Sequence, residues 1–443
     1  MITTLVGRTF LKAYNEKHNK DYSAKEFFEE VYFELFFNHP KYMQWVTNSP
    51  FVQMKKGQKP HLLTSDERIE KLENLYAKVE EESADASFAI GYPAAESKSF
   101  ASTSGLVSDI TIETEEDDVY LSWIGGGLGI GIAGGFNLLI NDPEITLVTF
   151  EGWKYYRKYL NDLTLEKLRG NQINSWNGQW LTYKLGKNFI DDFDFADLEQ
   201  KKIFKIDDKL TEINTVNWAN LFFSLSNQYP NKTLNAYIYS FGQTNKTIGF
   251  IPIYLKAGER LKDVFKQLYK TDAPFATKDF QSLYGMHIKR ACELGNIGLQ
   301  ALKPDGLKKY MEGGKNLSFS KNKDKRKQQI LIYQSYKTWL IAMASKNKEQ
   351  ITDYTLELAN LILRYRGNAK GTTGKNLIEK ELFGAKSKRN FINALTEMIP
   401  ITEGVDLETL KKLKDEVHLM TNEEFGYFST LLKFDYAFVE KQS

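Results

Sequence analysis

The chain has 443 residues, more than the ~250 to 300 at which a single hydrophobic core stops growing, so two or three domains are expected. Its one cysteine, Cys292, excludes an internal disulfide framework and a cysteine-ligated zinc site. Together with a start, Met1 to Arg8, that lacks a signal-peptide pattern, it favours a reducing cytoplasm. The net charge of +2 decides nothing by itself, but residues 315–390 carry 17 Lys or Arg against 6 Asp or Glu.

The first 85 residues have helical patterns. A helix is predicted from Val6 to Asn15, and Ser23 with Glu26 forms a capping box ahead of a second helix, Phe27 to Phe37. A second capping box, Thr64 with Glu67, begins a charged helix that runs to about Glu82.

From about residue 86 the pattern changes to short β-branched runs between acidic or glycine-rich turns, which predicts a sheet. The first predicted strands are Leu106 to Thr114, Val119 to Ile124 and Ile145 to Phe150, with the acidic run Glu113 to Asp118 as a turn. An aromatic helix, Gly152 to Leu160, follows the third. Two later strands, joined as a hairpin, and then a helix are predicted at Asn235 to Phe241, Thr247 to Leu255 and Ala257 to Tyr269.

Strand signals end near residue 314. Six helices separated by Gly, Pro, Asn or Asp are predicted at 325–346, 349–366, 374–383, 387–398, 406–419 and 421–439. The sequence therefore predicts an α+β protein: an irregular mixed α/β N-terminal body with an antiparallel sheet (1–314, with a helical start at 1–85 and a sheet-containing core at 86–314), then an all-α helical bundle (315–443) whose leading part is basic.

Glycine is concentrated between Trp123 and Phe136. Such a stretch lets another backbone, a phosphate or a base approach closely. Its spacing nearly fits a dinucleotide fingerprint, but the strand, turn and helix of that motif are not predicted around it. Two other interpretations remain open: glycine-rich strands packed in a core, or a loop that contacts nucleic acid through Gly125, Gly126 and Gly127. Its many glycines and Asn137 argue against a membrane span over Ile124 to Ile140.

No motif predicts catalysis. The five histidines have no metal-ligand spacing, Cys292 has no suitably placed base, and Gly367 to Asn376 fails the P-loop pattern at Ala369 and Asn376. We therefore predict no catalytic residue, no metal site and no cofactor. The spacing of three residues resembles a nuclease motif: Asp142, Glu151 and Lys154, with Lys154 one position too far from Glu151. A metal-dependent nuclease therefore stays an alternative.

Basic residues form three clusters that suit a phosphate track, because cations that neutralise phosphates give salt-sensitive affinity without sequence preference. A Ser/Thr-rich stretch, Ser97 to Gly105, is a further candidate contact. The alternative is a solvated lysine-rich surface. The candidate residues outside the glycine stretch are Lys98, Ser99, Ser102, Thr103, Ser104, Lys321, Lys323, Lys325, Arg326, Lys327, Arg364, Arg366, Lys370, Lys375, Lys386, Lys388 and Arg389.

Three features taken in order resemble the large subunit of Cascade, the multi-subunit complex of type I CRISPR interference, in a form similar to type I-B. They are the glycine-rich Trp123 to Phe136, the Ser/Thr-rich Ser97 to Gly105, and the closing helices Gln328 to Tyr436 with Met420-Thr421-Asn422-Glu423-Glu424-Phe425. The resemblance is architectural and covers most of the chain loosely. The paired CxxC motifs of some relatives are absent, which leaves the subtype open.

The resemblance implies a non-catalytic, DNA-binding subunit of an RNA-guided antiviral-defence complex. Its N-terminal body would recognise the motif flanking a double-stranded DNA target and recruit a helicase-nuclease in trans. Its bundle would support the displaced single strand and contact other subunits of the guide RNA-protein complex, while base pairing with the guide reads the sequence. No membrane is implied. A structural, partner-binding protein without nucleic acid remains a third alternative, in which the aromatic surplus serves the core and interfaces.

Overall fold

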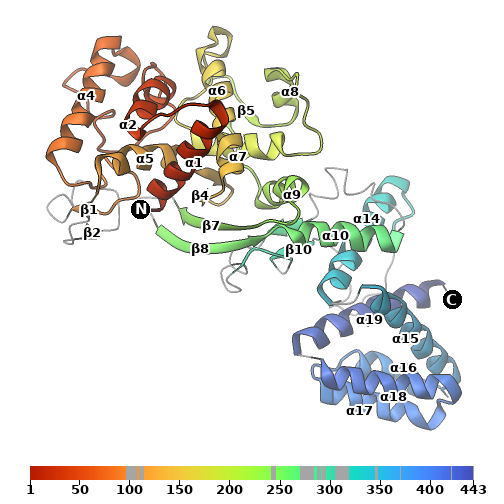
Figure 1. Cartoon of the computed structure of the whole chain (residues 1–443). Helices are drawn as coiled ribbons and strands as arrows, with labels where there is room; N and C mark the ends of the chain where they lie inside the picture. Colours follow the sequence, from red (N-terminus) through yellow and green to blue (C-terminus); the bar gives the residue numbers. More distant parts are fainter. Residues whose placement is uncertain are drawn as a thin grey trace. The chain divides into compact units, whose positions relative to one another are not determined.

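The structure is a computed structural model that describes residues 1–95, 107–108, 114–240, 246–269, 284–286, 291, 296–299, 301–304, 319–344, 348–369, 371–420 and 422–442. The fold is α+β, as predicted (Figure 1). Two compact units form: a mixed unit, Met1–Lys256 with Ile288–Gly298, and a helical unit, Ala257–His287 with Leu299–Ser443. The chain therefore passes between the units three times, and the helical unit begins earlier than residue 315.

Helices fill the start of the mixed unit, as predicted. Helix α1 ends at His18, and the next residue, Asn19, adopts the left-handed conformation common at helix C-termini. Both capping boxes are confirmed: the side chain of Ser23 accepts a hydrogen bond from the Glu26 amide, and that of Thr64 accepts one from the Glu67 amide. The elements are α1 (Ile2–His18), α2 (Ala24–Phe27), a π-helical segment (Phe28–Phe33), α3 (Glu34–Phe36), a 3₁₀ turn (Pro60–Leu62) and α4 (Ser65–Glu81).

Two of the predicted strands are wrong. Val119 to Ile124 lies in helix α5 (Glu116–Gly127), and Ile145 to Phe150 lies in helix α6 (Pro143–Asn161), which also contains the predicted helix Gly152 to Leu160. The acidic run predicted as a turn supplies the first turn of α5, where carboxylates favour the positive end of the helix dipole. Burial of these β-branched residues in a helical core outweighs their weak strand preference.

A four-stranded antiparallel sheet has the order β3-β4-β7-β8. The predicted hairpin is confirmed as β7 (Thr233–Ser240) and β8 (Lys246–Tyr254), which pair from Thr233 opposite Tyr254 to Ser240 opposite Lys246. Strand β3 (Ile130–Ile132) lies within the glycine-rich stretch, and β4 (Phe136–Ile140) begins at the last residue of that stretch. Figure 1 shows β8 on the outer side of β7, away from helix α1.

The remaining elements surround a core rich in aromatic side chains. Trp123, Trp153, Trp176 and Trp180 are each almost fully buried there, which accounts for part of the high aromatic content. These elements are β1 (Ala94–Ala95), β2 (Val107–Ser108), a 3₁₀ turn (Leu163–Leu165), α7 (Ile173–Lys184), α8 (Phe195–Gln200), β5 (Phe204–Ile206), β6 (Thr211–Ile213) and α9 (Trp218–Gln228).

The helical unit contains all six helices predicted after residue 314 and also α10, predicted as Ala257 to Tyr269. Two segments that precede residue 314 pack on the helix Lys323–Ala344. Tyr284 Oη donates to Ser335 O at 3.0 Å, and Trp339 Nε1 donates to Leu299 O at 3.0 Å. The elements are α10 (Lys256–Tyr269), β9 (Tyr284–Met286), β10 (Leu302–Pro304), α14 (Lys323–Ala344), α15 (Lys348–Asn368), α16 (Thr373–Asn376), a π-helical segment (Leu377–Leu382), α17 (Lys388–Met398), a 3₁₀ turn (Ile399–Ile401), α18 (Gly404–Leu419) and α19 (Asn422–Gln442).

None of the helices in the described parts of the chain combines the length and the apolar character needed to cross a bilayer. The apolar stretch Ile124 to Ile140 instead forms the end of α5 followed by β3 and β4.

Candidate nucleic-acid interface

The first basic cluster surrounds the start of α14. Asn322 caps this helix: its Oδ1 accepts from the amides of Asp324 at 3.1 Å and Lys325 at 3.2 Å. The capped start fixes the first turn, and every side chain from Lys321 to Gln328 is exposed. The five cations presented here are Lys321, Lys323, Lys325, Arg326 and Lys327.

These five cations are not neutralised within the described residues, where no carboxylate oxygen is found within 4.0 Å of their nitrogens. Cations are unfavourable at a helix N-terminus, because the aligned peptide dipoles already place positive partial charge there. These cations therefore destabilise the start of α14, and Asp324 is the acidic residue of the first turn that partly offsets them. The result is a compact positive surface that suits an anion such as phosphate.

The second cluster is largely used inside the fold. Arg364 makes a two-pronged ion pair with Asp406, with Nε to Oδ2 at 3.0 Å and Nη2 to Oδ1 at 2.5 Å. The bonds to Asp406 raise the pKa of Arg364 above its ordinary value. Arg366 donates to Tyr436 Oη at 2.8 Å and pairs with Glu440. Both arginines join α15 to later helices, which sequence spacing does not reveal.

The other cations of the second and third clusters are likewise of two kinds, some bonded within the fold and some exposed. Lys388 donates to the carbonyls of His418 at 3.2 Å and Met420 at 2.7 Å, at the end of α18. Lys375 lies 3.8 Å from Glu379 in an exposed helical pair. Lys386 and Arg389 are exposed without an ion pair among the described residues, while Lys370 lies outside them. The three clusters therefore reduce mainly to the surface at residues 321–327, which we call the α14 basic surface.

The aromatic residues that follow this surface belong to the core of the helical unit. Tyr333 and Tyr336 are buried and stack on Phe434 with ring centroids 4.6 and 5.7 Å apart. Trp339 is 9% exposed. The α14 basic surface consequently offers charge without rings for base stacking.

Gly125, Gly126 and Gly127 are buried in the last turn of α5, so nucleic acid cannot reach them in this arrangement. A Cβ on Gly125 would meet the carbonyl oxygen of Thr3, because α1 and α5 cross backbone to backbone. A Cβ on Gly126 would lie 2.8 Å from Ile90 Cδ1. The interpretation of close core packing therefore describes these glycines, although in a helix rather than in strands.

The Ser/Thr-rich candidate contact falls on residues that the structure does not describe. Lys98, Ser99, Ser102, Thr103 and Ser104 lie outside the described residues. So does Cys292.

The three residues of the nuclease alternative each have a different role. Asp142 caps α6 and lies 3.0 Å from Lys232 Nζ. Glu151 lies 3.1 Å from Lys184 Nζ, and the ammonium of Lys154 lies 5.1 Å from the centre of the Phe150 ring. Nine residues of helix separate the two carboxylates by roughly 13 Å along the axis. Among the described residues no group of three or more His, Cys, Asp or Glu is placed to hold a metal.

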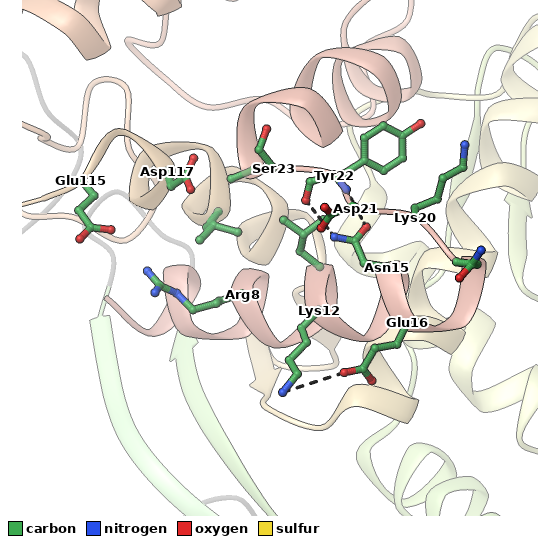
Figure 2. A pocket seen from close by; sticks show the side chains of 14 residues that line it. Arg8, Lys12, Asn15, Glu16, Lys20, Asp21, Tyr22, Ser23, Glu115 and Asp117 are labelled. Atoms are coloured by element: carbon green, nitrogen blue, oxygen red, sulfur yellow. Dashed lines mark hydrogen bonds and ion pairs between the residues drawn. The ribbon is translucent and has the colours of Figure 1, made fainter.

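A surface hollow of about 570 Å³ lies between α1, the loop before α2 and the start of α5 (Figure 2). Figure 2 shows Lys12 paired with Glu16, at 4.0 Å, on one wall. Arg8 pairs with Asp118 at 2.7 Å, and Asn15 exchanges hydrogen bonds with the backbone of Tyr22. The charges of the lining are mixed and partly paired, so the hollow selects no ligand of one sign.

Sequence reasoning missed one exposed feature, the aromatic side of β8. Phe250 is 61% and Tyr254 44% exposed, whereas Ile251 and Ile253 between them are buried. The alternation of these side chains was the signal, since strand residues point in turn to opposite faces.

Comparisons with known proteins identify no relative: no protein-family model, no curated protein and no solved structure matches the chain.

Proposed function

We propose that this protein is a non-catalytic nucleic-acid-binding subunit of a multi-subunit complex. The observation that carries the proposal is the α14 basic surface, with five exposed cations that lack carboxylate partners among the described residues. Cations that serve folding in this unit, such as Arg364 and Arg366, are paired. Unpaired charge held at an unfavourable helix position is best explained by a polyanionic partner.

The resemblance to the Cascade large subunit supplies the more specific form of the proposal. In that form the mixed unit recognises the motif flanking a DNA target and recruits a helicase-nuclease. The helical unit supports the displaced strand through the α14 basic surface and contacts neighbouring subunits. The single cysteine agrees with a role in the cytoplasm.

Binding through this surface must depend on salt, because each neutralised phosphate releases counterions. Five contacts would contribute a slope of roughly −3.5 to a plot of log K against log salt for single-stranded DNA, at about −0.7 per contact. The slope and the affinity should fall together when the cations are removed.

The test measures fluorescence anisotropy of labelled single-stranded and duplex DNA with the full chain, from about 50 to about 300 mM salt. The variant K321Q/K323Q/K325Q should lose affinity and reduce the slope by about 2. The matched control, K411Q/K412Q/K414Q, removes three exposed lysines of α18 in the same unit and should change both quantities little.

Equal slopes for the two triple variants would remove the α14 basic surface from the proposal. A full chain that binds neither DNA at the lowest salt would overturn the proposed function and favour a structural, partner-binding protein.

A further inference from the structure

One face of the sheet in the mixed unit becomes progressively more exposed toward its edge. On this face, Leu139 of β4 is buried, Tyr237 of β7 is partly covered, and Phe250 of β8 is 61% exposed. The register places Leu139 opposite Tyr237, and Tyr237 opposite Phe250. Helix α1 contacts β4, so the covered side lies under α1 and the open side is at β8 (Figure 1).

The open side presents rings rather than aliphatic side chains. The Tyr237 and Phe250 ring centroids are 5.3 Å apart with planes inclined at 56°, so the tyrosine supports the phenylalanine from one side. Tyr254, on the same face of β8, is 44% exposed. The aliphatic residues described in these two strands turn to the opposite face and are buried, as Leu234, Ile238, Ile251 and Ile253 show.

The strands of the hairpin carry no acidic side chain that would repel a polyanion. No Asp or Glu occurs in the sequence between Glu212 and Glu259, whereas Lys232, Lys246 and Lys256 do. Lys232 is paired with Asp142 and Glu144, and Lys256 is exposed. Aromatic side chains are also common at protein interfaces, so the absence of carboxylates from these strands is what favours a nucleic acid as the partner. Exposed rings without nearby carboxylates in the strands match the stacking platforms of single-strand binding proteins.

The spacing of the two rings fits a strand with unpaired bases. Phe250 and Tyr254 are four residues apart, so their Cα atoms are separated by roughly 13 Å along β8. Extended single strands place neighbouring bases several ångströms apart and leave each base free to stack on an aromatic side chain. Duplex DNA keeps its bases within the helix and cannot use such a platform.

We propose that the open part of this sheet face, through Phe250 and Tyr254 of β8, is a base-stacking platform for single-stranded DNA. This inference rests on the proposed nucleic-acid-binding function and adds a second contact in a different unit. It uses the bases of the strand, whereas the α14 basic surface uses the phosphates.

The experiment compares two probes with the full chain: an oligothymidylate and an abasic oligomer of the same length and charge. Phe250→Leu keeps an apolar, strand-compatible residue and removes the ring. It should weaken oligothymidylate binding about tenfold, as expected for loss of one stacked base, and leave abasic binding unchanged. Tyr254→Leu should act in the same direction. The control Leu163→Ala removes an 89% exposed apolar side chain of the same unit and should leave both affinities unchanged.

The outcomes separate the two proposals. If both probes bind and Phe250→Leu changes neither affinity, or changes both equally, the stacking platform is wrong and the proposed function stands. If the unaltered chain binds neither probe, the proposed function fails first. Circular dichroism of each variant checks that the sheet remains folded.

Discussion

The ammonium of Lys337 lies 2.5 Å from Oδ1 of Asp435, whose side chain is fully buried, and Thr355 donates to the other carboxylate oxygen at 2.8 Å. The three residues join α14, α19 and α15. Replacing Asp435 with Leu leaves a nearly buried ammonium without a counter-charge, which should destabilise the helical unit by about 3 to 5 kcal/mol. Hydrogen-deuterium exchange of the α14 and α19 amides in the full chain measures the loss.

The double variant K337M/D435L provides the matched control, because replacing both charges with apolar residues is often nearly neutral. Its exchange should return close to that of the unaltered chain. Lys412→Ala breaks an exposed pair with Glu416 at 3.9 Å and should cost less than about 0.5 kcal/mol. Equal losses from D435L and K412A would contradict the structural role of the buried pair.

Two glycine-to-alanine changes should have opposite effects on stability, because one glycine lies at the crossing of α1 and α5 and the other is exposed. Gly125→Ala places a methyl group against the carbonyl of Thr3 and should destabilise the mixed unit by about 1 to 3 kcal/mol or more. Gly426→Ala, at an exposed position of α19 with no atom nearby, should stabilise its helix by about 0.5 to 1 kcal/mol. Thermal unfolding of both variants decides the signs; a Gly125→Ala protein as stable as the original would contradict the close crossing.

Arg366 predicts a change in stability without a change in DNA binding. Its bonds to Tyr436 and Glu440 raise its pKa, which marks a cation already used inside the fold. Arg366→Gln should lower the unfolding midpoint of the helical unit and leave the salt slope of DNA binding unchanged. The K321Q/K323Q/K325Q variant should instead reduce the salt slope of DNA binding without lowering the unfolding midpoint. A flatter salt slope in Arg366→Gln would show that this arginine also contacts phosphate.

His39 predicts a dependence of stability on pH. Burial, with Arg157 nearby, lowers the pKa of His39 to about 4, and its Nδ1 accepts a hydrogen bond from the Lys41 amide at 2.9 Å. In the unfolded chain a histidine titrates near pH 6.5. Between these values the unfolded state binds one more proton, so stability should fall as the pH is lowered from about 6.5 to about 4.

Urea unfolding at several pH values tests this, with His39→Gln expected to reduce the slope and His61→Gln, an exposed control, expected to leave it unchanged. An NMR titration of His39 that gives an ordinary pKa would contradict the prediction.

The helices after residue 314 were predictable because each begins and ends with local signals. Strands were mispredicted at α6 although the start signal was present: Asp142 accepts from the amides of Glu144 and Ile145, and Pro143 occupies the first helical position. A run of β-branched residues concealed that signal. The two-unit division depends on segments such as Tyr284 and Leu299 that return to pack on α14, and no local pattern encodes such long-range packing.

The candidate site was predictable in part. Charge clustering located the α14 basic surface, because those cations lie within seven consecutive residues. It did not distinguish them from Arg364 and Arg366, since the partners Asp406 and Glu440 are 42 and 74 positions away. The exposure of Phe250 likewise depends on the edge position of β8, which is decided by the order of strands in the sheet.

The chain passes between the two units three times, which limits where a gene fusion could join another sequence without splitting a unit. A gene fusion or natural crossover at residue 315 would separate α10 and the strands β9 and β10 from the helices they belong with. A junction before Ala257 would transfer the helical unit, but it would also remove Ile288–Gly298 from the mixed unit. Exchange of one unit between related proteins is therefore expected to require compatible sequences on both sides, and the two units should be inherited together.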